Sequence, residues 1–120
     1  MDDIFTMRLN EPYFSSIYNG KKKYEIRIND EKRRELEVGN LITFICRDDP
    51  TKQYTCEIEQ LLYFDTFVEL FNNIRKEDCG FKSTQTADEI EDLFLKFRPA
   101  RGLNEQGIVA IKIKRINFVK

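Results

Sequence analysis

The spacing of apolar residues predicts a small domain in which short strands alternate with a few helices. Alternation with a period of two residues is typical of a half-buried strand, and it occurs in residues 24–28, 54–58 and 109–113. Residues 7–9 are expected to form a short first strand. Residues 41–46 are nearly all apolar, which predicts a strand buried on both faces. A turn at Asp48-Asp49-Pro50 follows, so residues 41–46 and 54–64 are expected to form an antiparallel pair.

Apolar residues at helical spacing predict three helices. Asn10 is expected to cap the first helix, which begins at residues 11–13. Two capping boxes, Thr66 with Glu69 and Thr86 with Glu89, predict the starts of two more helices before the last strand. The order of elements therefore predicts an α+β fold in a single domain spanning residues 1–120, a small β-barrel of about five or six mostly antiparallel strands with about three helices packed around it.

Composition excludes several kinds of chemistry. The chain has no histidine, which removes the usual general base, the commonest zinc ligand and every Ser-His or Cys-His nucleophile pair. Cys46, Cys56 and Cys79 are odd in number and lack Cys-x-x-Cys spacing, so we expect reduced, mostly buried thiols and neither a metal site nor a cofactor. No apolar stretch is long enough for a membrane helix, and we expect a cytoplasmic protein without a membrane partner.

The charge is distributed unevenly along the chain. The net charge is −1, yet residues 21–34 contain seven basic and three acidic side chains, and residues 96–120 contain seven basic and one acidic side chain. If these two basic segments meet on one face, an acidic protein offers a local anion-binding surface.

The most informative segment is the octad of residues 20–27, where a turn leads into a strand. Glu25 and Arg27 share one strand face, close enough to interact while Arg27 stays available to a phosphate or a base edge. Strict alternation places Lys22 on the opposite face from Glu25. Lys22 therefore reaches the same place only if it lies before regular strand geometry begins.

Gly20, Lys22, Glu25 and Arg27, followed by Gly39-Asn40 before the next strand, resemble the Gly-x-Lys-x-x-Glu-x-Arg signature of the ASCH family. This resemblance implies a PUA-like β-barrel with helices over a cleft at one end, and an association with RNA. One branch of the superfamily hydrolyses the amide of N4-acetylcytidine with a lysine, a threonine and a downstream glutamate. Lys22 matches that lysine, Glu25 stands at the threonine position, and Glu69, near the downstream glutamate, belongs to a capping box.

Three hypotheses on function follow. In the first, the domain binds RNA or a nucleotide through a cleft lined by Lys22, Glu25 and Arg27; electrostatic support would come from Lys32 and Arg33, and from Arg98 and Arg101 in a loop before the last strand. In the second, the domain is an enzyme in which Lys22 and Glu25 act as acid and base on a modified nucleoside or RNA, which requires a buried lysine. In the third, it is a protein-interaction module.

The same residues also have purely structural interpretations. Residues 21–23 can form a solvated basic turn, Glu25 and Arg27 a surface ion pair of little energetic value, and residues 32–34 a solvated face. At least three of the aromatic residues near the octad are expected in the core; these are Tyr13, Phe14, Tyr18 and Tyr24. An enclosed pocket the size of a nucleoside would favour the enzyme, and an open basic groove would favour the binding module.

Overall fold

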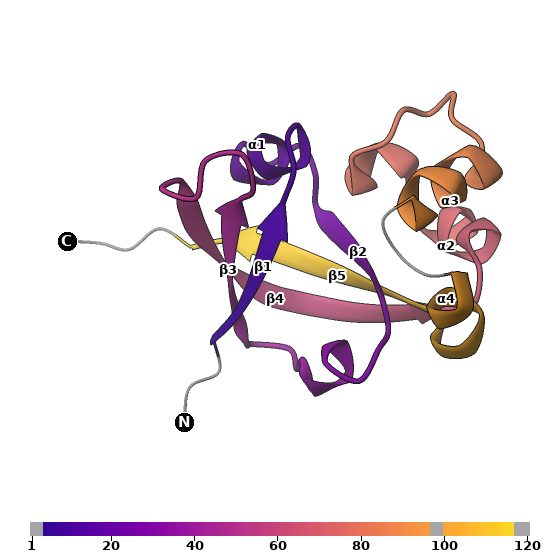
Figure 1. Ribbon diagram of the computed structural model, residues 1–120, viewed down its shortest axis with the longest axis horizontal. Helices are drawn as coiled ribbons and strands as arrows, with labels where there is room; N and C mark the ends of the chain where they lie inside the picture. The colour runs from indigo at the N-terminus through magenta and orange to yellow at the C-terminus, as the bar shows by residue number, and fades with distance from the viewer. Residues whose placement is uncertain (1–3, 97–99, 117–120) are drawn as a thin grey trace.

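The computed structural model describes residues 4–96 and 100–116. In this part of the chain one five-stranded sheet curls into a half-barrel, with strand order β1-β3-β4-β5-β2 (Figure 1). The strands are β1 (Ile4–Leu9), β2 (Tyr24–Ile28), β3 (Leu41–Cys46), β4 (Gln53–Phe64) and β5 (Ile108–Arg115). The β1–β3 pair is parallel, and the other three pairs are antiparallel. The predicted α+β barrel with mostly antiparallel strands is thus confirmed.

The helices are placed unequally around the sheet. They are α1 (Tyr13–Tyr18), α2 (Phe67–Asn73), α3 (Ala87–Leu95) and α4 (Ala100–Gln106), with 3-10 turns η1 (Arg33–Glu35) and η2 (Lys76–Cys79). Figure 1 shows α2, α3 and α4 gathered at one end of the sheet, whereas α1 lies near the other end. The fourth helix was missed because its sequence, Ala-Arg-Gly-Leu-Asn-Glu-Gln, has no apolar periodicity; it is anchored by Leu103, which is buried in the core.

Two apolar clusters share β5. One fills the half-barrel and includes Phe44 and Ile111, and the other lies between the sheet and the helices and includes Leu70 and Ile108. Residues 108–111 of β5 are therefore buried on both faces. The prediction that residues 41–46 form a strand buried on both faces was wrong, because β3 alternates between buried and half-buried residues. The reason is topological: β5 is the strand whose outer face is covered by helices.

The helix caps predicted from the sequence agree in part with those in the structure. Thr86 and Glu89 form the complete predicted capping box at α3. At α2 the Thr66 hydroxyl accepts from the backbone N–H of Glu69, but the Glu69 carboxylate accepts from Asp65 and not from Thr66. The predicted cap on α1 is wrong, since Pro12 and not Asn10 occupies the N-cap position.

The three cysteines are free and buried, as expected. Burial raises the pKa of the Cys56 and Cys79 thiols to about 12, so both stay protonated at neutral pH. Across residues 4–96 and 100–116 the structure contains no helix with the length and apolar character of a membrane span.

Candidate functional site

A cleft of about 900 Å³ opens between the strands β1 and β2 and the helices α3 and α4. This volume lies within the range of small-ligand sites, roughly 300–1,000 Å³. Its basic lining residues are Arg8, Lys22, Arg27, Arg33, Arg47 and Lys96, and its acidic ones are Glu25 and Asp30. The cleft therefore carries a formal charge of +4 in a chain whose net charge is −1.

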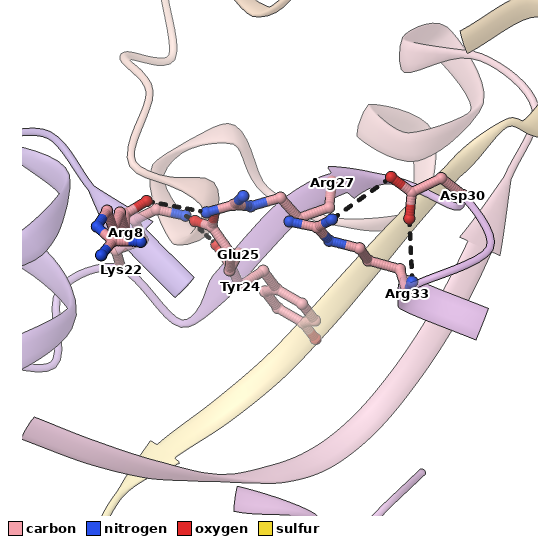
Figure 2. A network of polar contacts seen from close by, with 7 residues as sticks. All are labelled: Arg8, Lys22, Tyr24, Glu25, Arg27, Asp30 and Arg33. Atoms are coloured by element: carbon pink, nitrogen blue, oxygen red, sulfur yellow. Dashed lines mark hydrogen bonds and ion pairs between the residues drawn. The ribbon is translucent and has the colours of Figure 1, made fainter. Parts of the chain in front are cut away.

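An ion-pair network of three residues forms the base of the cleft. Lys22 and Glu25 are each only 5% exposed, and the Lys22 Nζ lies 3.0 Å from Glu25 Oε1. The Arg27 Nε donates to Glu25 Oε2 at 2.7 Å. Lys22 also donates to the carbonyl of Tyr24. Figure 2 shows the Glu25 carboxylate between the two cations, and this arrangement satisfies both of its oxygens.

The position of Lys22 explains why this network forms. Because β2 begins at Tyr24, Lys22 lies in the preceding turn and is free of the strand alternation that would separate it from Glu25. Its backbone N–H donates to the Ser16 carbonyl at 2.9 Å, which holds the turn against α1.

The electrostatics of the network favour an ionised carboxylate. Burial raises the pKa of Glu25, but the charges of Lys22 and Arg27 and their hydrogen bonds outweigh it and lower the pKa to about 2. Glu25 is therefore an anion at neutral pH that holds two cations in fixed positions.

Arg27 also links the two edges of the sheet. Its Nη2 donates to the carbonyl of Arg8 at 3.1 Å (Figure 2). Since β1 and β2 are the terminal strands in the sheet order, this hydrogen bond spans the open side of the half-barrel.

Arg33 adds a second guanidinium group to the cleft. It is half-buried and pairs with Asp30 at 3.4 Å, and its Nε is buried without a hydrogen-bond acceptor among the described residues. Burial, followed by the charge of Arg27, lowers the pKa of Arg33. Two like charges share this cleft, an arrangement that an anion would stabilise.

The structure brings some of the predicted site residues together and leaves others apart. Lys22, Glu25 and Arg27 form one network, and Arg33 lines the same cleft, whereas Lys32 is exposed and does not line it. Arg101 belongs to α4, so its predicted place in a loop was wrong. Arg98 lies outside the described residues.

Several cleft residues were missed by sequence reasoning. Arg8 belongs to β1, and Arg47 directly follows β3, the strand that pairs with β1 in parallel. Phe81 follows η2. Tyr13 and Phe81 contact each other edge to face, with ring centroids 6.1 Å apart, and form an aromatic part of the wall. No local sequence signal links these segments, because they meet only through the tertiary fold.

Gly80 is a further missed residue, since it makes room for Lys22. It has a φ of +88°, and a Cβ there would lie 2.9 Å from the Cδ of Lys22. Replacing Gly80 with alanine is expected to destabilise the fold by about 2–4 kcal/mol, from left-handed backbone strain plus overpacking against a lysine whose Nζ is held by Glu25. Urea unfolding measures this loss.

Gly39 provides a matched control for that substitution. It has a φ of +96°, but nothing lies within 4 Å of a Cβ placed there. Gly39→Ala should therefore show the backbone strain alone, about 1–2 kcal/mol. Equal losses at both glycines would show that the contact between Gly80 and Lys22 has no energetic weight.

Comparison with known proteins gives a family and a fold. The family model of the ASCH domain matches residues 7–116. The crystal structure of the hypothetical protein PH0355 is 26% identical, with a TM-score of 0.79 over 94% of this chain and 99% of that chain. Protein PF0455 from Pyrococcus furiosus is 22% identical, with a TM-score of 0.68 over 96% of this chain and 99% of that chain.

A more distant structure has the same fold. A mutant of ZmASCH from Zymomonas mobilis is 12% identical, with a TM-score of 0.63 over 96% of this chain and 74% of that chain. The search of curated proteins found no match.

Proposed function

This chain belongs to the ASCH domain family, and from that premise we propose that it binds RNA or a nucleotide in the cleft, with a phosphate group between Arg27 and Arg33. The carrying observation is the concentration of positive charge: six basic and two acidic side chains line one cleft of a protein with a net charge of −1. Guanidinium groups suit this ligand because their planar donors match phosphate oxygens.

The remaining cleft walls suit a nucleobase. Tyr13 and Phe81 supply aromatic surface, and Leu93 and Phe94 of α3 supply apolar surface. Single-stranded bases stack on such side chains. Both oxygens of Glu25 are already bonded to Lys22 and Arg27, so its role in this proposal is to position the two cations.

The test is a titration of fluorescein-labelled oligouridine and of UMP by fluorescence anisotropy and calorimetry. Arg27→Gln and Arg33→Gln should each weaken binding about 10- to 150-fold, the loss of one hydrogen bond to a charged group. Arg75→Gln is the matched control, because Arg75 is an exposed arginine outside the cleft. Unchanged affinity in a folded Arg33→Gln variant would contradict the proposal.

A second candidate function is hydrolysis of an acetylated cytidine-type nucleoside or RNA. It is favoured by the burial of Lys22 in the cleft, which such a mechanism requires. Against it, a Glu25 whose pKa is about 2 is a weak general base at neutral pH. Incubation with N4-acetylcytidine, followed by mass spectrometry, separates the two: a product that is absent with Lys22→Gln would identify a hydrolase.

A further inference from the structure

A second basic groove lies on the other side of the turn that carries Lys22. This β5 groove, of about 570 Å³, is lined by the end of α1, the turn before β2 and the end of β5. Its charged lining residues are Lys22, Lys23, Lys112, Lys114, Arg115 and Glu59. Five basic side chains thus face one acidic side chain, and of these six residues only Lys22 also lines the cleft.

The fold explains how these charges meet. The backbone N–H of Ile113 donates to the carbonyl of Lys23 at 3.0 Å, which ties the turn to β5. Residue Tyr24 pairs with Lys112 in the antiparallel β2–β5 register. The beginning of the basic segment 21–34 and part of the basic segment 96–120 therefore come together here.

Three lysines of the β5 groove are available for a ligand. Lys23 and Lys114 are exposed and Lys112 is half-buried, and within residues 4–96 and 100–116 none of the three takes part in an ion pair. Lys114 is opposite Glu57 in the β4–β5 register without forming such a pair.

An aromatic side chain stands at the edge of the β5 groove. Tyr18 is one of four aromatic residues of which at least three were expected in the core; it is 51% exposed, and the guanidinium carbon of Arg115 lies 4.2 Å from its ring centroid. An exposed ring beside a row of cations is the combination that holds single-stranded nucleic acids, because bases stack on the ring while cations follow the backbone.

Lys22 lines both the cleft and the β5 groove, so the two surfaces adjoin at one turn. We propose that the β5 groove binds the backbone and one base of the nucleotides next to the one held in the cleft. The ligand is then a single-stranded RNA of several nucleotides and not a free nucleotide. This inference rests on the proposed function of the cleft.

The experiment compares UMP with an oligouridine octamer, using the double variant Lys112→Gln/Lys114→Gln and the single variant Tyr18→Leu. For the octamer, the double variant should make the negative slope of log K against log salt shallower by about 1.4, since each lost phosphate contact removes about 0.7 from its magnitude for single strands. Tyr18→Leu should weaken octamer binding about 5- to 150-fold, the loss of one stacked base. Neither variant should change the affinity for UMP.

Lys52→Gln/Lys82→Gln is the matched control, because both lysines are exposed and line neither surface. An octamer that binds no more tightly than UMP, or a salt slope equal to that of the control, would overturn the inference and leave the cleft proposal standing. Loss of octamer binding in the groove variants, with no effect of Arg27→Gln or Arg33→Gln on either ligand, would instead overturn the cleft proposal. If polyglutamate bound as tightly as the octamer, and the groove variants weakened both equally, the β5 groove would be assigned to an acidic protein and the inference overturned.

Discussion

Replacing Glu25 with alanine is expected to lower the free energy of unfolding by about 3–5 kcal/mol, the usual cost of removing one partner from a buried ion pair. The reason is the position of this carboxylate, which is 5% exposed and lies 3.0 Å from the Lys22 ammonium and 2.7 Å from the Arg27 guanidinium. Without it, two cations remain close together with little water to solvate them. Equilibrium unfolding in urea, followed by circular dichroism, measures the change.

Two further variants make this prediction specific. Glu25→Gln keeps the volume and one acceptor but removes the charge, so it should also be strongly destabilising. Glu77→Ala removes an exposed carboxylate whose nearest distance to Arg75 is 3.8 Å, and it should cost less than about 1 kcal/mol. A Glu25→Ala protein as stable as Glu77→Ala would show that the buried network does not contribute to folding.

Acid should destabilise this protein through the same carboxylate. The pKa of Glu25 is about 2 in the folded protein against an ordinary value of 4.5. A lowered pKa gives stability that is fully present above about pH 5 and is lost as the pH falls through 4.5 towards 2. The shift corresponds to about 3 kcal/mol at neutral pH, as an order of magnitude. Urea unfolding at pH 6.5 and at pH 2.5 would show it.

Other carboxylates contribute to the acid response, so a reference variant is needed. Glu11, Asp49 and Glu89 also have lowered pKa values, because hydrogen bonds from Ser15, Thr51 and Thr86, respectively, favour their ionised forms. The difference between the wild-type and Glu25→Gln curves isolates the buried group. Curves with the same pH dependence would mean that Glu25 titrates normally in the folded state.

The fold was predictable wherever local chemistry decides the conformation. The alternation in residues 24–28 placed Ile26 and Ile28 in the core, and the capping box at Thr86 located the start of α3. The burial of whole strand faces was not predictable in the same way. Whether β3 or β5 is covered on both faces depends on where the helices pack, and helix α4 itself is held by tertiary burial of Leu103.

The candidate site was likewise predictable only where its residues are close in sequence. The octad indicated Lys22, Glu25 and Arg27 because they lie close together in sequence. It could not indicate Arg8, which reaches the cleft from β1 at the opposite edge of the sheet. The prediction of a solvated face for residues 32–34 was wrong for Arg33, which turns into the cleft while Lys32 and Arg34 remain exposed.

The hydrogen bond from Arg27 to the Arg8 carbonyl makes one side chain serve both sheet closure and the proposed ligand contact, because Glu25 and Arg8 accept from only two of its five N–H groups. In a closed barrel, backbone hydrogen bonds join every pair of neighbouring strands. Here the two edge strands of the sheet, β1 and β2, are bridged by a guanidinium donor. An anion bound to the remaining N–H groups would hold the guanidinium in place against the Arg8 carbonyl. Closing of the seam between β1 and β2 and occupancy of the cleft would then be thermodynamically linked, so that a ligand would make this seam open less often without touching the core.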